Sequence, residues 1–173
     1  MKKIITKSII LFFLTFSSCF KVNIPLDARE DYLGDQLRID GLYHQITPDG
    51  YIVNLRFFYR NGIQFIISFS EKITDPAELD SILTKEKIES HRKRKYNWGI
   101  FKINNNDFFS EHWATPEQGH YLATITMTGE ILSDTCYMTT ELVHSQEGIF
   151  KGVGKWYFYP FSPKPDSTNV FIK

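Results

Sequence analysis

Apolar and polar residues alternate along most of the chain from Leu37 onward, with the two-residue period of a β-strand that has one buried face. The first such run covers residues 37–44. The clearest pair covers residues 51–70, where two alternating runs flank an Asn-Gly pair at 61–62. Both turn residues accept a positive φ, so they favour a tight hairpin. A Pro-Asp-Gly sequence at 48–50 marks the preceding turn. The pattern therefore predicts consecutive antiparallel strands.

The alternation returns after residue 97 and predicts further strands at 98–103, 108–113, 121–127, 131–139 and 156–161, with a polar loop at 140–148. About eight strands then follow one another through mostly short turns, which is typical of an antiparallel meander. A meander that closes into a barrel has no exposed edge strands. We therefore expect a mainly β fold that closes as a barrel of about eight strands. An open β-sandwich is the alternative.

Residues 75–95 interrupt the alternation. Asp75 is a favourable N-cap, Pro76 suits the first helical position, and apolar residues then recur at roughly helical spacing. These features predict one amphipathic helix over 75–95, after the third strand. The basic run at 91–95 complements the dipole at the helix end, which we favour over contact with an anionic surface.

One charged residue stands inside an apolar strand. In the run at 51–59, Leu55 and Phe57 share the apolar face and Arg56 lies on the opposite face. The alternation therefore predicts that Arg56 points outward into solvent. If it faced inward, its guanidinium would be suited to bind a carboxylate or a sulfate in a fork geometry.

The N-terminus has the layout of a secretory signal peptide over residues 1–18. Three Lys form a basic start, an apolar run follows at 8–16, and two small Ser residues precede Cys19. The apolar run is shorter than the roughly 20 residues that a membrane-spanning helix needs. An ordinary cleaved signal peptide with an incidental Cys is the alternative to a lipidation signal.

The sequence Phe16-Ser17-Ser18-Cys19 resembles the lipobox of bacterial lipoproteins, in which the Cys is acylated and becomes the first residue of the mature protein. Leu is preferred where Phe16 stands. The resemblance implies a membrane anchor at Cys19. The charged residues before Leu37 show no clear period, so we expect residues 19–36 to hold the lipidated Cys and a linker, and residues 37–173 to form a single β domain. That domain, with its ending at 164–169, looks similar to small uncharacterised bacterial lipoproteins. Phe20 in place of Asp implies the outer membrane, facing the periplasm.

Composition supports a single soluble domain on that tether. The chain has 173 residues, about one domain, and 42% are hydrophobic, which is enough for a packed core. Removal of residues 1–18 takes three Lys and no acid, so 17 basic and 20 acidic residues remain, a net charge of −3. This balance argues against nucleic acid as a partner. With Cys19 acylated, Cys136 is the one free thiol, expected to be buried and structural.

Gly41-Leu42-Tyr43 resembles the Gly-x-Trp sequence near the start of lipocalins, although the expected helix follows the third strand rather than the last. The resemblance implies a lipocalin-like barrel around one small ligand. Aromatic residues make up 16% of the chain and are the richest candidates for a pocket. The residues chosen as ligand contacts are Tyr43, Tyr59, Trp98, Trp113 and Tyr121, and the alternative is that they form the core.

We find no catalytic motif, no metal-ligand spacing and no cofactor signature. Glu111 and His112 are adjacent on a strand and so point to opposite faces, while the strand acids Asp40, Glu111 and Asp134 are the candidates for a carboxylate pair. The sequence therefore favours a non-enzymatic, lipid-anchored cell-envelope protein that binds a small apolar or amphipathic ligand. The alternative is an envelope assembly or protein-interaction module with a filled core.

Overall fold

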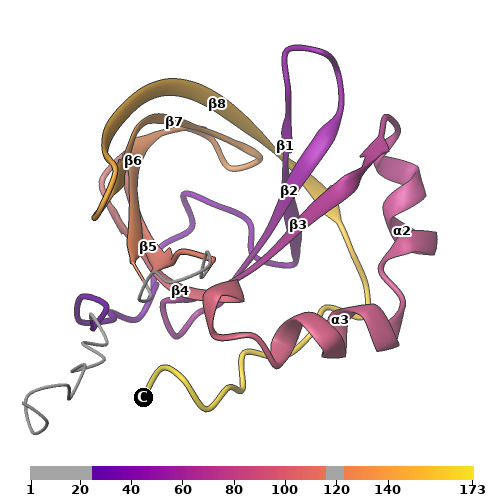
Figure 1. Ribbon diagram of the computed structural model, residues 1–173, viewed down its shortest axis with the longest axis horizontal. Helices are drawn as coiled ribbons and strands as arrows, with labels where there is room; N and C mark the ends of the chain where they lie inside the picture. Colours follow the sequence, from indigo (N-terminus) through magenta and orange to yellow (C-terminus); the bar gives the residue numbers. More distant parts are fainter. Residues whose placement is uncertain (1–24, 116–122) are drawn as a thin grey trace, which may run out of the picture.

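The computed structural model describes residues 25–115 and 123–173 and forms a closed barrel of eight antiparallel strands (Figure 1). Each strand pairs with its neighbour in sequence, and the last pairs with the first. The strands are β1 (Gly41–Ile46), β2 (Ile52–Phe58), β3 (Ile63–Ile73), β4 (Trp98–Asn104), β5 (Asp107–Trp113), β6 (Thr124–Ser133), β7 (Cys136–His144) and β8 (Gly148–Pro160). The predicted closed barrel is confirmed, and the β-sandwich is not formed.

The predicted hairpin at 51–70 is confirmed as β2 and β3. Gly62 has φ of 71°, which a glycine accepts without a steric penalty, and its N–H donates to the carbonyl oxygen of Tyr59 at 3.0 Å. The prediction of a polar loop at 140–148 is wrong for most of these residues. β7 continues to His144, and Glu141 pairs in register with Lys151 of β8. These two strand ends are largely exposed, so they lack the apolar alternation on which the prediction depended.

The helical segment after β3 is confirmed, but it is not one continuous helix. It comprises the 3₁₀ turn η1 (Pro76–Glu78), helix α2 (Leu79–Ile82), helix α3 (Lys85–Arg92) and the 3₁₀ turn η2 (Lys95–Asn97). Asp75 caps η1 as expected, in a capping box with Glu78. The helix breaks at Leu83, whose ψ is 58°, and Thr84 starts α3 by accepting a hydrogen bond from the Lys87 N–H. A local N-cap thus overrides the apolar spacing.

The strands β2 and β3 are buried on both faces. Leu55, Phe57 and Phe65 point away from the barrel interior and yet are fully buried, because α2 and α3 lie along the outside of β3 (Figure 1). This outer core also contains residues of the helices, of the neighbouring strands and of the chain after β8, among them Leu79, Leu83, Ile88, Trp98, Trp113 and Phe161. The apolar face of the hairpin therefore faces the helices, and the opposite face lines the barrel.

Aromatic side chains fill one end of the barrel interior. Phe108 packs against Tyr137 with ring centroids 4.4 Å apart, and Phe58 packs against Phe101 at 4.6 Å. Tyr43 and Trp156 complete this cluster. These six rings pack against one another and form a buried aromatic core at this end.

The segment before β1 closes the filled end. Tyr32 is 5% exposed, its N–H donates to the carbonyl oxygen of Arg60, and its hydroxyl accepts the Leu37 N–H at 2.7 Å. Leu26 also packs against the outer core. The described part of the expected linker, residues 25–36, is thus attached to the barrel rather than free, because its apolar side chains have a surface to cover.

The chain after β8 has no regular structure and binds α3 to the barrel. Arg92 of α3 forms an ion pair with Asp166 at 2.9 Å. Lys164 donates through Nζ to the backbone carbonyl oxygens of Ile39 and Phe58, and its burial lowers its pKa to about 8. In the described residues, no helix is long and apolar enough to cross a membrane.

Candidate functional site in the open half of the barrel

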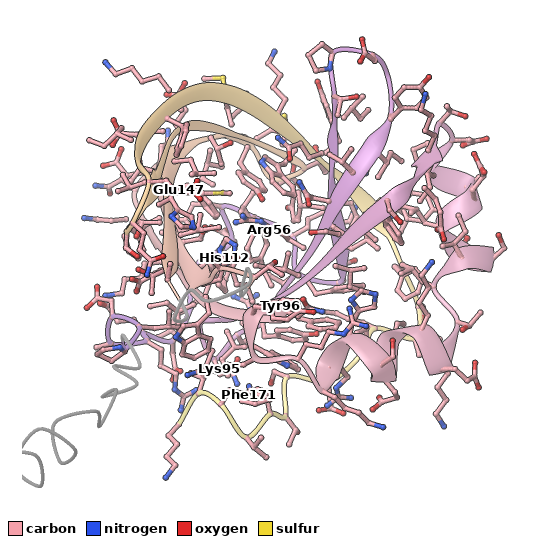
Figure 2. The ribbon with its side chains drawn as sticks, viewed as in Figure 1. Arg56, Lys95, Tyr96, His112, Glu147 and Phe171 are labelled. Carbon is pink, nitrogen blue, oxygen red and sulfur yellow. The ribbon has the colours of Figure 1, made fainter. Side chains whose placement is uncertain are left out.

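The end of the barrel opposite Tyr32 holds a cavity of about 400 Å³. Its walls come from β2, β3, β5, β6 and β8, and its rim comes from α3 and η2. The side chains that line it include Arg56, Trp113, Ile125, Met127, His112 and Trp156. Figure 2 shows Arg56 and His112 within the ring of strands, with Tyr96 toward α3.

The sequence of the inward-facing positions explains why this half is hollow. Along β2 the interior face changes from Phe58 to Arg56 and then Asn54, and the last two line the cavity. Along β5 it changes from Phe108 to Ser110 and then His112. Both strands thus replace a large ring by smaller or polar groups toward the same end. The interior is a packed core at one end and a polar-floored cavity at the other.

Arg56 forms the floor of this cavity. Its side chain is 1% exposed, and Nη1 donates to Ser110 Oγ at 2.8 Å and to Gln64 Oε1 at 3.2 Å. The guanidinium carbon lies 4.6 Å from the ring centroid of Trp156. The prediction that Arg56 points into solvent is therefore wrong. The helices cover the other face of β2, and two bulky apolar neighbours occupy it, so the polar residue faces the interior.

The guanidinium has no negative partner among the residues described. No carboxylate lies within ion-pair distance of it, and its Nε has no hydrogen-bond acceptor. Nη2 lies 2.8 Å from Met127 Sδ, and a thioether is a weak acceptor. Burial lowers the pKa of Arg56, but an Arg side chain keeps its proton in proteins. The floor therefore carries a buried positive charge with one unsatisfied edge.

Two more buried polar groups near Arg56 make no hydrogen bond of normal geometry in the described structure, His112 Nδ1 and the Tyr137 hydroxyl, although Tyr137 interacts with the Arg56 guanidinium. Burial, aided by the neighbouring Arg56, lowers the pKa of His112 to about 3, so the imidazole is neutral at physiological pH. Burial raises the pKa of Tyr137, against the opposing effect of Arg56, so the phenol keeps its proton. Both groups are able to donate or accept a hydrogen bond.

The rim adds positive charge and no negative charge. Arg94 and His91 line the cavity, and Asn97 Nδ2 lies 2.8 Å from His91 Nδ1. Burial, followed by the charge of Arg94, lowers the pKa of His91. Among the described lining residues there are two Arg, two His and no acid. The cavity therefore attracts anions.

The structure does not bring the sequence-predicted ligand contacts together. Trp113 lines the cavity, and the Lys95 ammonium lies 4.1 Å from its ring centroid. Tyr43 belongs to the filled end, where its hydroxyl donates to the carbonyl oxygen of Asp134. Tyr59 and Trp98 belong to the outer core. Tyr121 and Cys19 lie outside the described residues.

Arg56 and His112 are the site residues that the aromatic prediction missed. The signal for Arg56 was available, because a single charged residue in an apolar strand requires a partner if it is buried. The sequence offered no comparable indication for His112. Apolar and polar residues do not alternate strictly along β5, and the adjacent Trp113 is buried as well, so the pattern does not show which face His112 occupies.

The other candidate chemistry is spread over separate places. Glu111 accepts the Asp27 N–H at 2.6 Å, and Asp40 pairs with Arg38, so these acids do not meet in the cavity. No group of three or more His, Cys, Asp or Glu in the described ranges lies close enough to hold a metal ion. Cys136, expected to be buried, is partly exposed at the start of β7, and its burial raises its pKa.

No protein-family model matches the chain, and neither a curated protein nor a solved structure was found to match it. The barrel is established by its own strand pairing, and the lipocalin resemblance of Gly41-Leu42-Tyr43 stays a prediction.

Proposed function

We propose that this protein is a non-enzymatic binder that holds one small amphipathic molecule in the open half of its barrel. The observation that supports it is the cavity of about 400 Å³ left by the aromatic core. Small-molecule sites are commonly about 300–1,000 Å³, with mainly apolar walls and a few polar groups that orient the ligand. Ile125, Met127 and Trp113 supply such walls, and Arg56 supplies the polar floor.

The alternative function, an assembly module, is favoured by a different observation. It predicts a filled core and a contiguous apolar surface. Some large apolar side chains are exposed in the described structure, among them Ile149 and Phe150 at the start of β8. The core, however, is filled at one end only. The hollow half of the barrel therefore supports a binder more than an assembly module.

Obstruction of the cavity is expected to abolish ligand binding. Ile125 lines the cavity and is partly exposed, so Ile125→Trp adds bulk there without replacing a core residue. N-phenylnaphthylamine, a neutral dye that fluoresces in apolar surroundings, is the probe for fluorescence titration. We expect at least about a tenfold weaker affinity for Ile125→Trp, because a ligand loses much of its apolar contact.

The matched control is Thr126→Trp, one residue along β6, whose side chain points to the outside of the barrel. It adds the same indole and is expected to leave dye affinity unchanged. If the two variants weaken the dye equally, or if the wild type does not bind it, the protein does not use this cavity as proposed.

We also propose that the mature protein is anchored in the cell envelope through acylated Cys19, in the outer membrane and facing the periplasm. The basic start, the short apolar run and the small residues before Cys19 support this proposal. Two or more acyl chains suffice for stable anchoring. Cys19→Ser is expected to remove the lipid mass and to release the protein from the membrane fraction of its own host. A Cys19→Ser protein that stays membrane-bound with unchanged mobility would contradict the anchor.

A further inference from the structure

We infer that the ligand carries an anionic head group, of the carboxylate or sulfonate kind, which binds side-on to Arg56 at the floor of the cavity. This inference rests on the proposed function and specifies the ligand class. It makes Arg56 the specificity-determining residue of the site, and it places the apolar part of the ligand toward the open end.

The hydrogen bonding of Arg56 leaves one edge of the guanidinium available. A guanidinium offers parallel N–H groups from Nε and Nη2 along one edge, the fork that matches the two oxygens of a carboxylate. Protein acceptors instead hold Nη1, through Ser110 and Gln64. In the described structure Nε has no acceptor, Nη2 lies 2.8 Å from the sulfur of Met127, and the neighbouring Tyr137 hydroxyl interacts with the guanidinium without forming a hydrogen bond of normal geometry. The unsatisfied edge is thus the one suited to a planar anion.

The charge of the site leads to the same conclusion. A buried ion is stable in a protein when an opposite charge accompanies it. Arg56 is fully buried, and the described lining residues contain no acid, while Arg94 adds further positive charge. Neutral His112 and the protonated Tyr137 hydroxyl lack partners beside it, and each is able to donate to an anion. An anion therefore satisfies several groups that the protein leaves unsatisfied.

Met127 is the side chain that an entering head group must displace. Its sulfur lies 2.8 Å from Nη2, and the side chain is partly exposed on β6. Methionine is unbranched and adapts to new packing at little cost. A ligand oxygen in the position of this sulfur replaces a weak acceptor by a charged one, which strengthens the bond to Nη2. Among the other lining residues, Ile66, Trp113, Ile125 and Trp156 give apolar and aromatic surface that suits an alkyl or aryl body.

Competition between two ligands of equal length tests the head group. Bound N-phenylnaphthylamine is displaced from the full-length protein with decanoate or with decanol at about pH 8, where the carboxylic acid is ionised. We expect decanoate to compete at about tenfold or more lower concentration than decanol, because a charge-assisted pair is stronger than a neutral hydrogen bond. Arg56→Gln is expected to remove this preference while it keeps dye binding. Arg29→Gln makes the same change at an exposed Arg that does not line the cavity, and it is the control that keeps the preference.

The outcomes separate the two proposals. If the dye binds but decanoate and decanol compete equally, or if Arg56→Gln keeps the preference, the head-group inference is overturned and the cavity function stands. If the dye does not bind at all, both are overturned. Sulfate is the test for an inorganic anion. If sulfate displaces the dye, or raises the thermal midpoint, as effectively as decanoate, the ligand is an inorganic anion and the amphipathic ligand is overturned.

A second variant keeps the test decisive if Arg56→Gln does not fold. Arg56→Lys preserves the positive charge and removes the fork. We expect it to lose most of the preference for decanoate, whereas a purely electrostatic effect would preserve it and overturn the side-on geometry.

Discussion

Trp98→Ala is expected to lower the free energy of unfolding by about 3–5 kcal/mol, the usual cost of deleting a large aromatic side chain from a core. For a chain of this size, that loss lowers the thermal midpoint by roughly 10 °C. Trp98 is 0% exposed, stacks against Phe65 at 4.8 Å between centroids, and donates from Nε1 to the Arg92 carbonyl oxygen at 2.8 Å. It thus connects β3, β4 and the end of α3. Urea denaturation measures the loss.

Trp113→Ala is the comparison, since both tryptophans belong to the outer core but only Trp113 is among the lining residues of the cavity. We expect Trp113→Ala to weaken dye binding, and Trp98→Ala to leave the dye affinity of the folded fraction unchanged. A Trp98→Ala protein of normal stability that no longer binds the dye would show that Trp98 is a ligand contact, as the sequence suggested, and would displace the site.

The features predictable from sequence are those whose signal is local. An Asn-Gly pair between alternating runs specifies a hairpin from a few neighbouring residues, and Gly62 indeed takes a positive φ. Short turns place consecutive strands next to each other in an antiparallel meander. Such a meander removes its exposed edges when its last strand pairs with its first and the barrel closes. The break at Leu83 depends on a weaker local signal, a Thr84 cap, which competes with an apolar spacing that continues through it.

The location of the site depends on a fact that no local pattern contains, namely which face of each strand is inside. The alternation in β2 separates Leu55 and Phe57 from Arg56 correctly. The sequence predicts that the apolar face of β2 lines the barrel interior. In the structure, α2 and α3 cover that face from outside the barrel. Where a sheet is buried on both sides, alternation no longer distinguishes core from solvent. The same error placed Tyr59 and Trp98 in a pocket that they do not reach.

The burial of Arg56 on the interior face of β2 connects the stability of the fold with ligand binding. The guanidinium of Arg56 loses its hydration, and its two hydrogen bonds and its contact with Trp156 offset this cost only in part. A protein that needed Arg56 for folding alone would gain from a buried carboxylate beside it. The absence of one among the described residues is more readily understood if a ligand supplies the negative charge.

Acidification is expected to destabilise the protein through His112, before any carboxylate is protonated. The pKa of His112 is about 3 in the folded protein and about 6.5 in the unfolded chain, so the unfolded state binds one more proton between these values. The free energy of unfolding keeps its full value with respect to His112 above about pH 6.5. Below that pH it falls by about 1.4 kcal/mol per pH unit, and the total loss is about 5 kcal/mol near pH 3. Lowered pKa values at His44 and His91 act in the same direction.

Urea denaturation between about pH 7 and pH 4.5 measures the histidine contribution, because Asp166, whose pKa is about 2 in the folded protein, loses its contribution only as the pH falls below about 4. Comparison with a His112 variant then separates His112 from His44 and His91. His112→Gln is expected to reduce the slope of stability against pH by the equivalent of one proton. Ser110→Ala perturbs the same wall without a titratable group and is expected to keep the wild-type slope. Equal slopes in the wild type and His112→Gln would mean that His112 is already hydrated or charged at neutral pH.

The same measurement with decanesulfonate, which stays ionised throughout this range, connects the histidine to the ligand. Arg56 contributes to the low pKa of His112 because two positive charges in one cavity repel each other. A bound sulfonate on the guanidinium compensates that repulsion and raises the pKa of His112 in the folded protein. At the acidic end of the range, near pH 4.5, the slope of stability against pH is therefore expected to become shallower when the ligand is present. Arg56→Gln is expected to respond much less, because it lacks the guanidinium that holds the sulfonate.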